Sequence, residues 1–276
     1  MPLISTRGSA SSRATGFLSG EYINTTAYGT PPVAGYYMWL DGAHDASFAY
    51  SGGSVSTWTD RSANALVFNK QSTSTVSRNY NLNGRKTVSF PGSYAYFTSS
   101  AAATTWKFLH DGTQNTVFIV FRSKETASTS NYLLDTVGAG YSGFQVQVDG
   151  TTNFVEAQLR GVFSNSYVSN REAIPSTGFN IFTYAIDPNN ATALDILIVY
   201  KNSGSAISAD YFNNWTTSTG DPSFPLWIGL GYSSFFPSYE QYSFYGDIAE
   251  IIIYKSALSS TDRNSVINYL KTKWGI

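Results

Sequence analysis

Short runs of apolar residues recur between residues 36 and 254, with the periods expected of β-strands. Residues 116–121 form an apolar run, which is typical of a central strand covered on both faces. Apolar and polar residues alternate from 144 to 149, which predicts a half-buried strand with Gln145 and Gln147 on its polar side. The other runs predicted as strands are 36–40, 55–59, 86–90, 94–98, 132–137, 154–159, 179–186, 194–200, 226–230 and 248–254.

Turn signals separate most of these runs by only a few residues, so neighbouring strands are expected to be antiparallel. Pro91 and Gly92 predict a turn that joins residues 86–90 and 94–98 as a pair. Residues 187–190 read Asp-Pro-Asn-Asn, which predicts a further turn. The pattern therefore predicts roughly eleven to thirteen strands, an all-β fold built as a two-sheet antiparallel jelly-roll sandwich.

The end of the chain has the pattern of one short amphipathic helix. Ser259 can cap its first turn, with Asp262 three residues later. Apolar residues recur every four positions from 266 to 274, and two lysines lie in the last turn, where positive charge suits the exposed carbonyl groups. Gly275 predicts the helix end.

Five segments carry a resemblance to a known family. Residues 246–254 read G-D-I-A-E-I-I-I-Y, residues 269–275 read Y-L-K-T-K-W-G, residues 39–41 read W-L-D, residues 55–64 read V-S-T-W-T-D-R-S-A-N, and residues 82–90 read L-N-G-R-K-T-V-S-F. They resemble laminin-G-like domains of the concanavalin A-like lectin/glucanase superfamily. The resemblance implies a jelly-roll domain over residues 35–276, and because this sandwich carries lectins, hydrolases and structural modules alike, it implies no single function.

Residues 1–34 do not have the pattern of the sandwich. They are small, polar and rich in glycine and serine, with two arginines before the first acidic residue. Such a segment is either a flexible leader or an anchoring arm that orders on a partner. Its sequence, P-L-I-S-T-R-G with an aromatic residue shortly after, resembles the leader of structural proteins in tailed bacteriophages. On that interpretation Ile4, Arg7, Arg13 and Phe17 are the candidate docking residues.

Composition excludes several classes of function. The net charge is −1, so the chain lacks the excess of positive charge that is typical of a nucleic-acid-binding protein. There is no cysteine, so disulfides and thiolate metal sites are excluded. No apolar run approaches the roughly 18 residues of a membrane-spanning helix. The first residues lack the basic region and apolar stretch of a signal peptide, so a location at a virion surface would be reached by particle assembly.

Catalytic patterns are missing as well. A glycoside hydrolase needs two carboxyl groups on one face, roughly 5–9.5 Å apart. The hydrolases of this superfamily carry a Glu-x-Asp-x-x-Glu type strand, which this sequence lacks. Asp247 and Glu250 come nearest, but a spacing of three places them on opposite faces of a regular strand. His44 and His110 are the only histidines, and no Gly-x-Ser-x-Gly motif is present, so no enzyme is predicted.

Metal and sugar sites have weaker signals. Several superfamily members hold Ca²⁺ in rim loops, so the resemblance makes Asp41, Asp45 and Asp60 candidate ligands, although aspartate also favours turns for local reasons. No other cofactor is predicted. Aromatic rings beside polar side chains can stack on a sugar, pack on a neighbouring subunit or cover the sandwich edge. The candidates are Trp215, Tyr232, Phe235, Phe236 and Tyr239.

The preferred interpretation is a bacteriophage virion structural protein, a head decoration, neck or tail fibre component. Residues 1–34 would dock it to other virion proteins, and the sandwich would add weak adhesion to host glycans, strengthened by many copies. Low surface charge favours a homo-oligomer. The alternative is a carbohydrate-binding lectin module, and a second alternative is a polysaccharide-degrading hydrolase.

Overall fold

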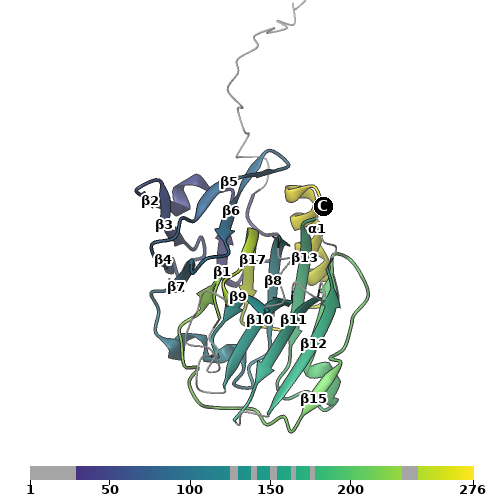
Figure 1. Ribbon diagram of the computed structural model, residues 1–276. Helices are drawn as coiled ribbons and strands as arrows, with labels where there is room; N and C mark the ends of the chain where they lie inside the picture. The colour runs from purple at the N-terminus through teal and green to yellow at the C-terminus, as the bar shows by residue number, and fades with distance from the viewer. Residues whose placement is uncertain are drawn as a thin grey trace, which may run out of the picture.

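The structure is a computed structural model, and it describes residues 29–124, 130–137, 142–149, 154–162, 166–174, 178–231 and 242–276. The chain forms two antiparallel sheets packed face to face, with one helix, α1 (Ser260–Trp274), on the outside (Figure 1). This confirms the predicted all-β sandwich with a short C-terminal helix. The candidate docking residues Ile4, Arg7, Arg13 and Phe17 lie outside the described residues.

Sheet A contains seven strands in the order β14-β13-β8-β17-β6-β5, with β1 also paired to β17. Its strands are β1 (Tyr36–Asp41), β5 (Ser77–Leu82), β6 (Arg85–Pro91), β8 (Asn115–Ser123), β13 (Asn180–Ile186), β14 (Leu197–Lys201) and β17 (Tyr245–Tyr254). The long strand β17 pairs with β8 along one side. On its other side it pairs first with β6 and then with β1, so it lies at the centre of the sheet.

Sheet B contains ten strands in the order β15-β12-β11-β10-β9-β16-β7-β4-β3-β2. Its strands are β2 (Phe48–Ser51), β3 (Ser54–Thr59), β4 (Val67–Gln71), β7 (Tyr96–Ser99), β9 (Ser130–Asp135), β10 (Gly143–Asp149), β11 (Phe154–Arg160), β12 (Tyr167–Ala173), β15 (Tyr211–Asn213) and β16 (Trp227–Ile228). Short 3-10 helices also lie between strands in the described part of the chain, among them η1 (Asp45–Ser47), η2 (Ala103–Leu109) and η3 (Ala193–Ile196).

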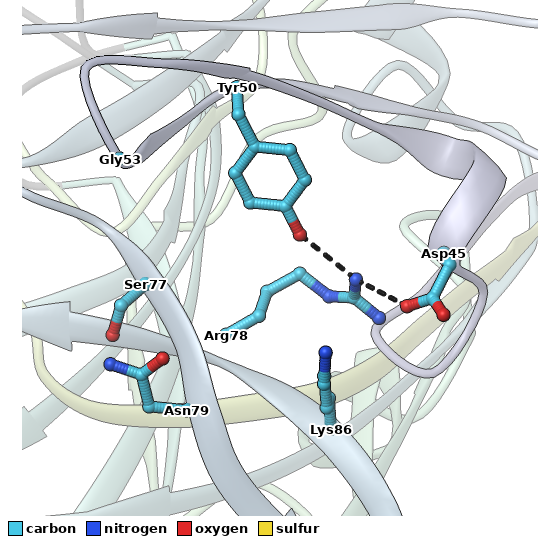
Figure 2. Close-up of a pocket in the computed structure, with 7 residues that line it drawn as sticks. All are labelled: Asp45, Tyr50, Gly53, Ser77, Arg78, Asn79 and Lys86. Atoms are coloured by element: carbon cyan, nitrogen blue, oxygen red, sulfur yellow. Dashed lines mark hydrogen bonds and ion pairs between the residues drawn. The ribbon is translucent and has the colours of Figure 1, made fainter. Parts of the chain in front are cut away.

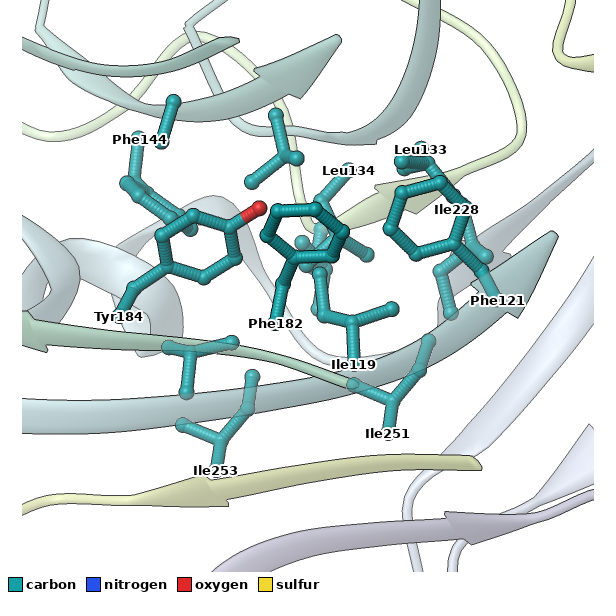
Figure 3. Close-up of a cluster of buried hydrophobic side chains, with 14 of the residues drawn as sticks. Ile119, Phe121, Leu133, Leu134, Phe144, Phe182, Tyr184, Ile228, Ile251 and Ile253 are labelled. Atoms are coloured by element: carbon teal, nitrogen blue, oxygen red, sulfur yellow. The ribbon is translucent and has the colours of Figure 1, made fainter. Parts of the chain in front are cut away.

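The main core lies between the two sheets. Figure 3 shows Phe121 and Phe182 of sheet A beside side chains of sheet B. The rings of Phe121 and Phe182 lie 5.4 Å apart, and Tyr184 meets Phe144 of sheet B edge-on at 5.9 Å. Aromatic contacts of this kind add to the area that the side chains bury. The contact between Tyr184 and Phe144 joins the two sheets, in a chain that contains no disulfide.

A second core lies between sheet A and α1, and it explains the apolar run in β8. Ile119 points into the main core, whereas Phe118 and Val120 point toward α1, so both faces of the strand are covered. Ser259 caps the helix by accepting a hydrogen bond from the backbone N–H of Asp262, at 3.1 Å. The predicted helix and the predicted central strand are both confirmed.

Two other predictions about strands are wrong. Residues 86–90 and 94–98 do not pair, because β6 belongs to sheet A and β7 to sheet B. Gly92, with φ of +74°, turns the chain from one sheet to the other instead of closing a hairpin. The run at 194–200 begins as the 3-10 helix η3 and becomes the strand β14 only from Leu197.

No helix of the described residues has both the length and the apolar character needed to cross a membrane.

His110 follows η2 and is fully buried. Its Nε2 lies 3.0 Å from the carbonyl oxygen of Gly220, so this nitrogen carries the proton and donates it. Nδ1 is buried and has no hydrogen-bond partner in the described part of the chain. Burial lowers the pKa of His110, and the bond to Gly220 opposes this only in part.

We therefore expect the free energy of unfolding to fall as the pH is lowered from about 7.5 to about 5.5, because unfolded histidine binds a proton near pH 6.5 and buried His110 does so only at lower pH. The slope contributed is at most about 1.4 kcal/mol per pH unit. Urea unfolding at the two pH values measures it. His110→Gln should flatten the dependence, whereas His44→Gln at a part-exposed site should change it less. An unchanged slope in His110→Gln would contradict the assignment.

Candidate functional site

Strands β10, β11 and β12 turn apolar side chains into the main core and polar side chains outward. Val146 and Ala157 lie in the core. On the other side Gln147 lies opposite Glu156, which in turn lies opposite Arg171 of β12. We call the outward side chains of these strands and β15 the polar face. It consists of Gln145, Gln147, Glu156, Gln158, Arg160, Tyr167, Ser169, Arg171 and Tyr211.

Glu156 is the centre of a hydrogen-bonded network on the polar face. Its carboxylate accepts from Gln147 Nε2 at 2.7 Å and from Gln158 Nε2 at 2.8 Å. Arg171 lies 3.4 Å from the same carboxylate. Gln145 extends the network by donating to Gln158 Oε1 at 2.6 Å.

This network corrects the prediction of a half-buried β10. Gln145 is only 3% exposed and Gln147 only 8%. The alternating pattern identified the polar side of the strand correctly. It did not predict burial there, because the amide groups bond to side chains of the next strand instead of water.

The exposed part of the polar face combines rings with cations. Tyr167 and Tyr211 are stacked, with ring centroids 5.1 Å apart, and Arg160 lies 5.3 Å from the Tyr167 ring. Tyr211 is 46% exposed, and the side chain of Arg171 is 60% exposed. Burial, and then the hydrogen bond with Tyr211, raise the pKa of Tyr167, so its hydroxyl stays protonated at neutral pH. The arrangement offers a flat aromatic surface beside hydrogen-bond donors.

Of the aromatic candidates from the sequence, only Trp215 falls in the described part of the chain. Its indole N–H donates to the carbonyl oxygen of Pro188 at 3.1 Å, and its ring packs against the main core. Contact between Trp215 and a glycan stays a prediction. The other candidates, Tyr232, Phe235, Phe236 and Tyr239, lie outside the described residues.

A cavity of about 390 Å³ opens between the β2–β3 hairpin and the β5–β6 hairpin (Figure 2). We call it the edge cavity, because β2 and β5 are edge strands of the two sheets. Its lining residues are Asp45, Tyr50, Gly53, Ser77, Arg78, Asn79 and Lys86. Arg78 donates to Asp45 at 2.7 Å and to the Tyr50 hydroxyl at 3.1 Å. The cavity is polar and carries more positive than negative charge.

The candidate calcium ligands are engaged with protein donors. Asp41 pairs with Arg61, and its Oδ1 lies 2.9 Å from Lys273 Nζ. Burial raises the pKa of Asp41, yet the two cations outweigh it and hold that pKa below its usual value. Asp45 pairs with an arginine, and Asp60 accepts backbone N–H groups. The described residues contain no group of three or more metal-binding side chains. Ca²⁺ at these aspartates would have to displace their donors, and it stays a prediction.

Asp247 and Glu250 lie on the same side of sheet A, which corrects the prediction of opposite faces. A β-bulge between Ile248 and Glu250 shifts the alternation of side chains. Glu250 accepts from Trp274 of α1 at 2.7 Å, and Asp247 accepts from Arg122 Nε at 3.0 Å. Both carboxylates are 0% exposed, and neither lines the edge cavity. The two carboxylates therefore bond to side chains of sheet A and of α1.

No protein-family model matches the sequence, and no curated protein sequence matches it. Solved structures do match. The binding domain of Paraclostridial Mosquitocidal Protein 1 has a TM-score of 0.58 at 11% identity, over 85% of this chain and 52% of that one. The binding domain of botulinum neurotoxin serotype C1 has a TM-score of 0.56 at 12% identity, over 86% and 52%. That of serotype D/C has a TM-score of 0.53 at 12% identity, over 86% and 52%.

At these identities the likeness shows the fold alone. This chain spans about half the length of the chains that it matches, 52% of each. The comparisons confirm the β-sandwich. Membership of the concanavalin A-like superfamily, the phage-like leader, the homo-oligomer and the virion location stay predictions, and these neighbours give them no support.

Sequence reasoning missed both the polar face and the edge cavity. The polar-face residues alternate with core residues at Gln145, Gln147, Glu156 and Gln158, so their shared side could be predicted. Which of these side chains contact one another depends on the register of β10, β11 and β12. The pattern of apolar and polar residues does not predict that register. β12 was not predicted as a strand, because its sequence YVSNREA is mostly polar. The edge cavity depends on two hairpins from different sheets.

Proposed function

We propose that this chain is a lectin-like module that binds carbohydrate on the polar face. The observation that carries the proposal is the exposed Tyr167–Tyr211 stack beside the network centred on Glu156. The apolar side of a sugar ring packs on an exposed aromatic ring, and its hydroxyl groups bond to neighbouring donors and acceptors. Arg160 and Arg171 supply the donors.

The buried network gives this surface rigidity. Gln147 and Gln158 are fixed by Glu156, and Arg171 lies within ion-pair distance of the same carboxylate. Side chains that are already held in place lose little conformational freedom on binding, which favours affinity for a small polar ligand.

The structural neighbours support binding, and not catalysis, as the activity. The chains matched above are binding domains of toxins. A further match, with a TM-score of 0.52 at 12% identity over 51% of its chain, comes from work in which cell entry of botulinum neurotoxin type C depends on interaction with two ganglioside molecules. Gangliosides carry sugar, so the ligand class agrees with the polar face. The carbohydrate-binding alternative from the sequence is therefore preferred to the virion role, which rests on residues 1–34.

We expect Tyr211→Ala to weaken glycan binding about tenfold, since truncating an exposed aromatic anchor typically costs about 1–2 kcal/mol. Binding is measured on a glycan array and then by calorimetric titration of the strongest glycan. Tyr211 is 46% exposed, so the thermal midpoint of the variant should stay close to that of the parent.

Phe212→Ala is the matched control. Phe212 is 41% exposed on the same strand, but it lies opposite Val168, on the other side of sheet B from Tyr211. It should bind glycans as the parent does. Equal binding by the parent and Tyr211→Ala would remove the polar face from the proposal, and a parent that binds no glycan would refute the proposed function.

A further inference from the structure

The edge cavity contains a positive charge that the protein leaves uncompensated. Arg78 and Lys86 line it with a single carboxylate, that of Asp45. The Asp45 side chain is 75% exposed, whereas that of Arg78 is 3% exposed. Lys86 is exposed, and its side chain makes no hydrogen bond or ion pair with any described residue. A pocket with a buried guanidinium and an unpaired ammonium group favours an anionic occupant.

Arg78 is positioned by the protein rather than by the ligand. Its Nε and Nη2 donate to the carbonyl oxygen of Gly42 at 3.0 and 2.6 Å. Its Nη1 donates to Asp45 and to the Tyr50 hydroxyl. These four bonds leave one of the five N–H donors of an arginine for a ligand. The guanidinium also lies 4.0 Å from the Phe48 ring, which fixes its plane.

The rest of the lining suits a sugar better than a bare anion. Tyr50, which is 53% exposed, lines the cavity. The exposed Asp45 carboxylate repels a simple anion, but it can accept hydrogen bonds from the hydroxyl groups of a sugar, which donate as well as accept.

We propose that the edge cavity binds an anionic saccharide unit, whose acidic group lies against Lys86 and Arg78 while Asp45 and the Tyr50 hydroxyl bond to its hydroxyl groups. Figure 2 shows the side chains of Asp45, Arg78 and Lys86 pointing into one space with Tyr50 above it, whereas those of Ser77 and Asn79 point away from Arg78. The proposal rests on the proposed glycan-binding function and adds a second subsite with a preference for acidic glycans. Sugar carboxylate and sugar sulfate share the chemistry, so both are tested.

The test uses an array that holds neutral glycans beside their sialylated, uronate-containing and sulfated counterparts. The full chain should bind acidic members at least about tenfold more strongly than their neutral counterparts, a difference of about 1.4 kcal/mol. Lys86→Gln should lose this preference while keeping its binding of neutral glycans. The preference should also fall as salt is raised, because an exposed ammonium group is screened.

Lys271→Gln is the matched control. It removes one positive charge from α1, none of whose residues lines the cavity, and it should keep the acidic preference. Comparison of the carboxylated and sulfated arms identifies the acidic group. If Lys86→Gln and the parent show the same acidic preference, or the parent shows none, the cavity proposal is wrong while neutral binding still supports the polar face. If no glycan binds, both proposals fail. Tyr211→Ala should weaken neutral binding without removing the acidic preference.

Discussion

Lys273→Met is expected to lower the free energy of unfolding by about 3–5 kcal/mol, the cost of leaving a buried charge without its partner. Lys273 is 2% exposed, and its Nζ lies 2.8 Å from Glu250 and 2.9 Å from Asp41. Asp41 keeps its contact with Arg61 in the variant, so Glu250 bears most of the loss. Urea unfolding of the parent and the variant measures the difference.

The pH dependence of this loss is a second check. Burial raises the pKa of Glu250, and Lys273 lowers it in part. Without the lysine, Glu250 binds a proton more readily in the folded chain, and a raised folded pKa gives stability at low pH that is lost as the pH rises. The cost of Lys273→Met should therefore be smaller at acidic than at alkaline pH.

Two further variants separate charge from packing. Lys273→Met combined with Glu250→Gln should recover part of the stability, because the double variant contains no unpaired charge at Glu250. Lys271→Met, two residues away on the same helix, should change stability little because that side chain is part-exposed. A loss for Lys273→Met no larger than that for Lys271→Met would refute the role of the ion pair.

These residues explain why sequence motifs predicted the fold so well. Trp39 of the early W-L-D segment donates its indole N–H to Glu250 at 2.6 Å, and Trp274 donates to the same carboxylate at 2.7 Å. Asp60, from the segment at residues 55–64, accepts a hydrogen bond from the backbone N–H of Trp39 at 2.6 Å. Segments far apart in the chain thus meet in one buried network beneath α1.

The same network explains why those motifs did not predict a function. Glu250 and Lys273 are buried under α1, whereas the polar face lies on sheet B and the edge cavity lies between hairpins. Residues that hold a sandwich together recur with the fold, and residues that contact a ligand vary with the ligand.

The errors of the sequence reasoning have a common cause. Pro91 and Gly92 were interpreted as a local turn between paired strands, but β6 pairs with β5, which precedes it, and with β17 near the end of the sequence. Gln145 and Gln147 were predicted as the polar side of a half-buried strand, but they bond to side chains of β11. A local pattern gives the face of a strand and not its partner, so sheet order and register could not be predicted.

Gly246→Ala is expected to cost about 2–3 kcal/mol, near the upper end for one methyl group added to a packed site. Gly246 opens the G-D-I-A-E-I-I-I-Y segment and lies in β17 between Phe90 of β6 and Ser123 of β8. A Cβ there would fall on the carbonyl oxygen of Arg122 and the ring of Phe244. The carbonyl belongs to the backbone of β8, which cannot retreat without breaking its hydrogen bonds to β17 and β13.

Gly178→Ala is the matched control, because a Cβ at Gly178 would meet no atom within 4 Å. That substitution should leave stability unchanged or raise it by up to about 1 kcal/mol, since alanine restricts the unfolded chain. Urea unfolding of both variants tests the comparison. If both alanines are tolerated equally, β17 is not packed as closely as the structure shows, and the glycine that opens the segment would need another explanation. If only Gly246→Ala destabilises, the segment begins with glycine because three strands approach closely there.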